Sequence, residues 1–200
     1  EGEGDPLTLL IRRTDSYEAT RKILYGSTPL IAQTSKINKL FLQGDQRRYF
    51  VPCKHCGEMQ YLKWSQMKYE KDEAGRLIYS SVHYECEKCG GHWKNTDKAY
   101  FLPRGEWRPT ATPVRPGLRS YHIPSMLSPI GMRSWESAVV EWIEAQGDQS
   151  KLRVFINTYL GEPYVERGEA PAPDRIMLRR ETSYFPESLT IADSGERIWG

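Results

Sequence analysis

The chain has 200 residues, a formal net charge of +2 and 38% hydrophobic residues, which allow one or two domains. Because positive and negative charges nearly balance, the net charge does not indicate which partners the protein binds. No stretch approaches the roughly 18 apolar residues of a membrane span, and no secretory segment is visible. We therefore expect no membrane contact, and reduced thiols in Cys-x2-Cys pairs fit an intracellular compartment. Because the chain opens without Met and ends without a helix stop, we also expect both ends to be cuts through a longer protein.

The first elements are predicted from capping and apolar runs. Residues 5–13 have the chemistry of a helix start, with Asp5 as the cap. Residues 21–26 are predicted as a short buried strand. The hydroxyl groups of Ser27 and Thr28 follow it, at the strand end where open α/β sheets place ligand chemistry. On these residues alone, an ordinary turn explains them better.

A second helix is predicted over 35–43, with Ser35 as its cap. Residues 48–93 then carry β-branched and aromatic residues beside two cysteine pairs, which predicts a ribbon of short antiparallel strands. Seven Lys/Arg face six Asp/Glu in this stretch. A phosphate-binding ribbon is usually more basic, so structural support or protein docking is favoured over reading DNA. The charged run 70–75 is predicted as a solvated tip.

The four cysteines stand as two Cys-x2-Cys pairs, Cys53 with Cys56 and Cys86 with Cys89, and 29 residues separate the pairs. A glycine follows each pair and permits the left-handed turn of a metal-binding knuckle. Four thiolates in a tetrahedral array suit a structural Zn²⁺, whose closed shell leaves no open catalytic position.

Other arrangements of these cysteines are less favoured. Two disulfides or four buried free thiols are the plain alternatives, but disulfides belong to secreted, Cys-dense chains. His55, His83 or His92 could replace one ligand, although four thiols already complete the shell.

The stretch 104–133 is irregular and basic, with a single acid, Glu106. Its arginines stand among aromatic residues on proline-rich loops, which suits contact with a nucleic-acid backbone. A connector with scattered solvated arginines explains the pattern equally well. The candidate DNA contacts are Arg104, Arg108, Arg115 and Arg119.

Residues 134–160 are predicted as a helical hairpin whose aromatic stripes form core. Residues 164–188 are expected to be a linker. The run 189–193 then begins like a buried strand and ends at Asp193, a candidate Mg²⁺ ligand whose alternative is a plain turn aspartate.

Several phrases in this order resemble the large subunit of tailed-phage terminases of the lambda type, over roughly residues 1–175. The phrases are Glu3-Gly4-Asp5-Pro6, Arg21-Lys22-Ile23-Leu24, Gly26-Ser27-Thr28-Pro29, Gly44 to Cys53 with Cys56-Gly57, Cys86 to Gly90, Gly105-Glu106-Trp107-Arg108, Tyr121-His122, and Asn157 to Pro163.

The resemblance implies an α/β fold in five parts. These are the end of a P-loop ATPase domain (1–45), a four-cysteine zinc ribbon (46–96), a connector and helical hairpin (97–163), a linker (164–188) and the start of a nuclease domain (189–200). It also implies that Gly26, Ser27 and Thr28 match the motif that couples ATP hydrolysis to DNA movement. No G-x-x-x-x-G-K-[ST] occurs here, so the phosphate loop would lie upstream. Residues 194–197 depart from the family pattern, which weakens the assignment of Asp193 as a Mg²⁺ ligand.

The predicted function is ATP-driven packaging of double-stranded DNA into procapsids and endonucleolytic cutting of concatemers by the full-length enzyme, with this piece alone inactive. The resemblance implies ATP, Mg²⁺ and structural Zn²⁺ as cofactors. It implies phage DNA, the small subunit, the procapsid portal and further copies of the chain as partners, in the host bacterial cytoplasm. Two alternatives stay open: a non-catalytic zinc-ribbon module that docks protein or nucleic acid, and a degraded prophage remnant.

Overall fold

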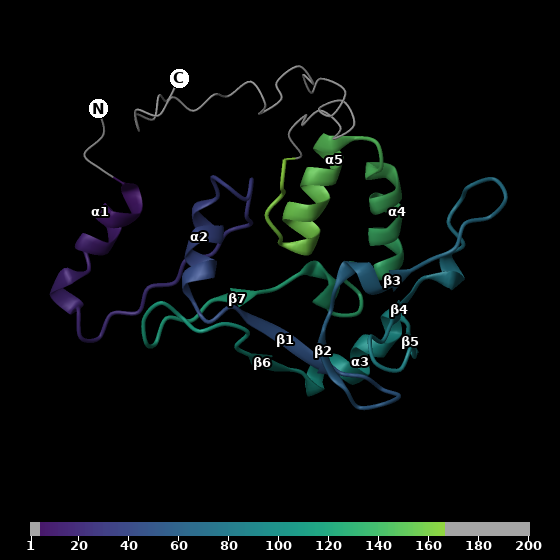
Figure 1. The fold of residues 1–200 in the computed structure, drawn as a ribbon, viewed down its shortest axis with the longest axis horizontal. Coiled ribbons are helices and arrows are strands. Elements are labelled where there is room, and N and C mark those ends of the chain that lie inside the picture. Colours follow the sequence, from purple (N-terminus) through teal and green to yellow (C-terminus); the bar gives the residue numbers. More distant parts are fainter. Residues whose placement is uncertain (1–4, 167–200) are drawn as a thin grey trace, which may run out of the picture. The chain divides into compact units, whose positions relative to one another are not determined.

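The computed structural model describes residues 5–166, which combine short strands with short helices (Figure 1). The strands are β1 (Arg47–Pro52), β2 (Met59–Tyr61), β3 (Met67–Lys68), β4 (His83–Glu85), β5 (His92–Trp93), β6 (Glu106–Arg108) and β7 (Tyr121–His122). The helices are α1 (Pro6–Arg12), α2 (Lys36–Gln43), α3 (Lys98–Phe101), α4 (Trp135–Ala145) and α5 (Gln149–Val154), which continues as a π-helix over Phe155–Leu160. Single 3₁₀ turns lie at Asp15–Tyr17, Trp64–Gln66, Tyr79–Ser81, Asn95–Asp97, Leu102–Arg104 and Ser125–Leu127. No helix among residues 5–166 has the length and apolarity that a membrane span requires.

The predicted helix starts are confirmed by their caps. The Asp5 carboxylate accepts the Thr8 N–H at 3.3 Å, and the Ser35 hydroxyl accepts the Asn38 N–H at 3.3 Å. Each cap satisfies a backbone donor that the first helical turn leaves without a partner. The two helices therefore begin where the sequence places them.

The buried strand predicted at residues 21–26 is wrong. The segment is extended but belongs to no strand, and Leu24 is 91% exposed. A strand needs a hydrogen-bonded neighbour, and neither described sheet pairs with these residues. The segment instead links α1 to the rest of the described chain (Figure 1).

A four-stranded sheet is built around β1. Strand β2 pairs antiparallel with Phe50–Pro52, and β6 pairs antiparallel along the other edge of β1. Strand β7 pairs parallel with Arg47 and Arg48, so β2 and β7 share one edge of β1. The sheet thus joins strands on both sides of the residue 96 boundary expected for the ribbon.

A separate sheet of three antiparallel strands runs in the order β3-β4-β5. The short antiparallel strands of the predicted ribbon are present, but they are divided between the two sheets. The loop between β3 and β4 is the predicted charged tip. Its Asp72 carboxylate accepts the N–H groups of Ala74 and Arg76, which holds an exposed turn in place.

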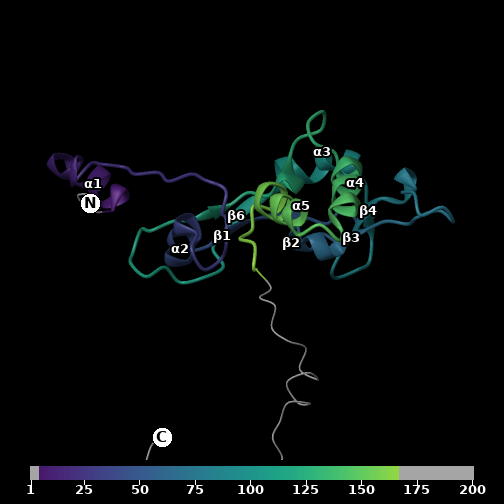
Figure 2. The ribbon, with the colours of Figure 1, turned by 90° about the horizontal axis from the view of Figure 1, so that it is seen from above.

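The predicted helical hairpin is confirmed as α4 and α5, which lie side by side in Figures 1 and 2. Ser134 caps α4 by accepting the Ser137 N–H at 3.1 Å. Gly147 lies between the helices with a φ of 85°, and Gly161 ends the π-helix with a φ of 65°. Both are left-handed conformations that favour glycine.

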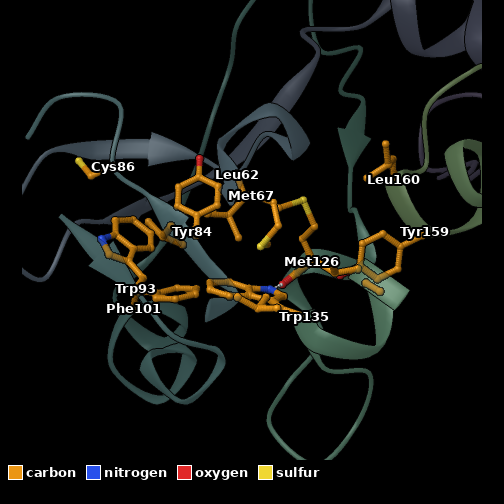
Figure 3. Close-up of a cluster of buried hydrophobic side chains, with 14 of the residues drawn as sticks. Leu62, Met67, Tyr84, Cys86, Trp93, Phe101, Met126, Trp135, Tyr159 and Leu160 are labelled. Atoms are coloured by element: carbon orange, nitrogen blue, oxygen red, sulfur yellow. Dashed lines mark hydrogen bonds between the residues drawn. The ribbon is translucent and has the colours of Figure 1, made fainter. Parts of the chain in front are cut away.

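Aromatic side chains from the second sheet, α3 and α4 form the centre of the core (Figure 3). Tyr84 and Trp93 lie 5.2 Å apart between ring centroids, and Phe101 stacks near Trp135 at 6.1 Å. The Trp135 indole N–H donates to the Met126 carbonyl at 3.0 Å, so the polar atom of this buried ring is satisfied.

A group of aromatic side chains joins the hairpin to the turn Trp64–Gln66, which lies between β2 and β3. Trp64 packs edge-on against Trp142, Phe155 and Tyr159 at centroid distances of 5.0–5.8 Å. The prediction that the hairpin aromatics are core residues is therefore confirmed.

Candidate metal centre

Four cysteine side chains converge from two turns that are far apart in the sequence. The turn between β1 and β2 supplies Cys53 and Cys56, and the turn between β4 and β5 supplies Cys86 and Cys89. All four Sγ atoms lie within 4.8 Å of one another. The fold thus brings together the two pairs that the spacing predicts to share one ion.

The two turns have the same local structure. The Gly57 N–H donates to the Cys53 carbonyl at 2.9 Å, and the Gly90 N–H donates to the Cys86 carbonyl at 3.0 Å. Their φ angles are 73° and 67°, in the left-handed region that glycine adopts without a steric penalty. A glycine at each of these positions is therefore what lets the chain turn back around the sulfur atoms.

The sulfur separations fit a tetrahedral cation site and exclude disulfides. Cys53 Sγ lies 3.8 Å from Cys89 Sγ, and Cys56 Sγ lies 3.9 Å from Cys86 Sγ. A Zn–S bond of about 2.3 Å gives a tetrahedral edge of about 3.8 Å, whereas a disulfide requires about 2.05 Å. All four cysteines are free thiols here.

Hydrogen bonds and crowding drive the ionisation of these thiols in opposite directions. Burial disfavours the Cys86 thiolate, but backbone N–H groups of Cys89 and Lys88 and the Gln60 amide together lower the pKa of Cys86 to about 6. The Gly91 N–H favours the Cys89 thiolate, but desolvation and hydrogen bonds with the other three cysteine side chains outweigh it and raise the pKa of Cys89 to about 12. A bound divalent cation would favour the thiolate form of the cysteines that bind it.

The nearby histidines do not join the cysteine cluster found among the described residues. A ring nitrogen of His55 lies 3.2 Å from the His92 carbonyl oxygen. The rings of His83 and His92 lie 3.9 Å apart, and His83 Nδ1 bonds the Ser81 carbonyl. The ligand set that the geometry supports is four sulfurs.

The predicted coupling residues lie on exposed, extended backbone. Gly26, Ser27 and Thr28 are all exposed, and the Ser27 hydroxyl donates to the Thr28 carbonyl at 3.0 Å. None of the three belongs to the cysteine cluster. Asp193 lies outside the described residues.

The four candidate DNA-contact arginines are exposed but differ in their partners. The Arg108 guanidinium pairs with Glu106 at 2.6 Å, and Arg104 lies 4.4 Å from the Tyr100 ring centroid. Neither Arg115 nor Arg119 has an ion-pair partner among the residues that the structure describes.

Two polar residues with defined roles were missed by the sequence reasoning. Gln60 lies beside the cysteine cluster, and its amide donates to Cys86 Sγ at 3.2 Å. His122 bridges Arg48 and the Leu160 carbonyl at 2.7 and 2.8 Å. Their partners lie 26, 74 and 38 positions away, so no local sequence pattern signals either role.

Comparison with known proteins gives matches over nearly the whole chain. The family model for the ATPase domain of phage terminase large subunit gpA matches residues 1–107, and the model for the gpA endonuclease domain matches residues 118–195. No solved structure matches.

Two curated relatives are both terminase large subunits. The one from Enterobacteria phage P21 is 28% identical over 206 residues, covering 92% of this chain and 31% of the relative. The one from Escherichia phage lambda is 28% identical over 236 residues, covering 100% of this chain and 35% of the relative. The chain thus spans about a third of the length of the curated relatives it matches. Since the ATPase-domain model alone matches more than half of its residues, the chain belongs to the phage terminase large subunit gpA family.

Proposed function

We propose that the chain is part of an enzyme that uses ATP to package double-stranded DNA into procapsids and cuts DNA concatemers with its endonuclease domain. The observation that carries this proposal is the pair of family matches, one to an ATPase domain and one to an endonuclease domain, in one chain. The five-part layout with boundaries near residues 45, 96, 163 and 188 belongs to the same proposal.

Within that enzyme, Cys53, Cys56, Cys86 and Cys89 would hold one structural Zn²⁺. The converging sulfurs, the two glycine turns and the tetrahedral separations support this assignment. A bound Zn²⁺ supplies folding free energy, about 10–16 kcal/mol in small zinc peptides. Here it would fix the β1–β2 turn against the β4–β5 turn. Four protein ligands would leave no position for a substrate.

ATP and Mg²⁺ would act in the full-length protein. Gly26, Ser27 and Thr28 would transmit ATP hydrolysis to DNA movement, and their exposed backbone is accessible for that contact. Asp193 would help bind Mg²⁺ in the nuclease domain.

DNA would be contacted by arginines of the stretch 104–133. Arg115 and Arg119 are the stronger candidates because their guanidinium groups are exposed and carry no ion pair among the described residues. Arg104 and Arg108 are already engaged with Tyr100 and Glu106. Binding through phosphates predicts a salt-dependent affinity that falls when Arg115 or Arg119 is replaced.

The partners would be those of a packaging complex in the host bacterial cytoplasm. They are phage DNA, the terminase small subunit, the procapsid portal and further copies of the large subunit. The exposed arginines and the two family matches support DNA as the first of these.

The test compares the 200-residue chain with the full-length protein that contains it. We expect one zinc per chain by elemental analysis in both. We also expect ATP hydrolysis and cutting of concatemeric DNA by the full-length protein alone. Zinc without either activity in the full-length protein would instead support a non-catalytic docking module. Hydrolysis by the 200 residues would overturn the proposed domain layout.

A further inference from the structure

Gln60 is a buried polar residue that connects the two cysteine turns. It lies at the middle of β2, directly after the turn that carries Cys53 and Cys56, and the residue is 5% exposed. Its amide reaches the other turn, where Nε2 lies 3.2 Å from Cys86 Sγ and Oε1 lies 3.1 Å from the Glu87 backbone nitrogen. One side chain therefore bonds two successive residues of the second turn.

The second of these bonds fixes the orientation of the amide. A backbone N–H can only donate, so the Gln60 atom beside Glu87 must be the carbonyl oxygen. The NH₂ group then faces Cys86 and presents a hydrogen to its sulfur. The amide is thus held as a donor toward a sulfur whose electron pairs a cation would share.

This side-chain contact has no counterpart on the first turn. Cys53 Sγ accepts a backbone N–H from His55 at 3.4 Å. Among the residues that the structure describes, Gln60 is the one residue other than cysteine whose side chain donates to a cysteine sulfur. The two turns are alike in backbone but differ in this added support.

We propose that Gln60 is a positioning residue for the metal: its amide holds Cys86 and the second turn against the β1–β2 hairpin in the arrangement that the ion requires. The inference rests on the proposed zinc site. A side-chain bond to a ligand atom fixes the direction of that ligand's lone pairs and reduces the charge concentrated on the sulfur. Gln60 would therefore raise metal affinity without touching the ion.

The experiment uses the 200-residue chain and two replacements of different chemistry. Gln60→Glu keeps an oxygen for the Glu87 N–H but presents a carboxylate to Cys86, which the surplus negative charge of four thiolates on one Zn²⁺ repels. Gln60→Leu fills the buried space and removes both bonds. Gln43→Glu makes the same charge change at an exposed position on α2 and is the matched control.

Metal binding is measured with Co²⁺ by its thiolate charge-transfer absorption, and with Zn²⁺ by competition against a chromophoric chelator. We expect both Gln60 variants to weaken Zn²⁺ binding by about 10–100-fold, with the larger loss for Gln60→Glu. Gln43→Glu should bind as the unchanged chain does. Circular dichroism of the metal-loaded proteins checks that each variant folds.

A second measurement needs no variant. In the unchanged chain loaded with ¹¹³Cd²⁺, we expect a through-bond NMR coupling between a Gln60 side-chain amide proton and the metal, carried through Cys86 Sγ. Absence of this coupling overturns the inference, as does variant affinity within about twofold of the unchanged chain. An unchanged chain that binds neither Co²⁺ nor Zn²⁺ overturns the metal proposal itself, so the two failures are distinguishable.

Discussion

The bridge made by His122 predicts a specific dependence of stability on pH. The Arg48 guanidinium can only donate, so it fixes His122 Nδ1 as an acceptor at 2.7 Å. Nε2 must then carry the hydrogen that is donated to the Leu160 carbonyl at 2.8 Å. A proton added to Nδ1 would face the guanidinium, so the folded protein requires the neutral imidazole.

The magnitude follows from the two pKa values. Burial, reinforced by the positive charge of Arg48, lowers the pKa of His122 to about 4, whereas an unfolded histidine titrates near 6.5. The unfolded chain therefore takes up this proton first, and stability falls as the pH decreases from about 6.5 toward 4. Between pH 7.5 and 5.5 the loss amounts to about 1.3 kcal/mol. The folded ring is still neutral at pH 5.5, so the unfolded value sets this figure.

The assay is urea unfolding of the unchanged chain and of His122→Gln at pH 7.5, 6.5 and 5.5. Glutamine can accept from Arg48 and donate to Leu160 without titrating, so the other ionisable groups cancel in the difference between the two proteins. We expect the free energy of unfolding of the unchanged chain to fall by about 1.3 kcal/mol more than that of the variant across this range. A difference that does not change with pH would refute the assigned bridge.

Three further predictions concern the metal, a buried charge and a close approach. Cys86→Ser should release the metal and unfold residues 48–93, measured by elemental analysis and circular dichroism, and retention of both would contradict the four-thiolate site. Lys98→Met should raise the free energy of unfolding at pH 7 by about 1–3 kcal/mol, because burial, partly opposed by Glu136, lowers the pKa of Lys98 to about 8. That gain in stability should vanish as the pH rises from about 8 through 10.5. If urea unfolding shows the same gain at every pH, the buried charge of Lys98 is not its cause. Gly105→Ala should destabilise the chain by about 1–3 kcal/mol, since its Cβ would lie 2.4 Å from a Tyr49 ring carbon. Gly26→Ala meets nothing within 4 Å and should have the urea midpoint of the unchanged chain; equal midpoints for both variants would contradict the crowding at Gly105.

Features fixed by neighbours in the sequence could be predicted. The caps Asp5, Ser35 and Ser134 bond backbone groups three residues ahead, so the helix starts are visible without tertiary structure. The apolar stripes of residues 134–160 likewise predict a hairpin. The two Cys-x2-Cys turns are local as well. That they meet is predicted by the shared metal-binding chemistry of their cysteines, not by their positions in the sequence.

Features fixed by partners far along the chain could not be predicted. The apolar run Ile23-Leu24-Tyr25 satisfies the local requirement for a strand, but pairing depends on a neighbour that the pattern does not specify. Gln60 and His122 take their roles from residues at least 26 positions away. Their burial follows from which face of a short strand is covered, and strands of two or three residues show too little alternation to reveal it.

Strands β1 and β7 pair across the two family segments, and the cysteine module lies in the chain that connects these two strands. β1 lies within the segment that matches the ATPase-domain model, and β7 lies within the segment that matches the endonuclease-domain model. They pair in parallel, which requires a long crossover, and here that crossover contains both cysteine turns.

The stretch 108–117 between the two matches is itself tied back to the fold. The N–H groups of Thr110 and Ala111 donate to the Asp45 carbonyl, and the Val114 N–H donates to the Gln43 carbonyl. The parallel pairing of β1 with β7, the His122 bridge to Arg48 and the packing of Trp64 on Trp142 also join the two segments. The two family segments therefore share one core up to about residue 165. A metal that fixes the crossover would stabilise the hairpin as well as the turns that bind it.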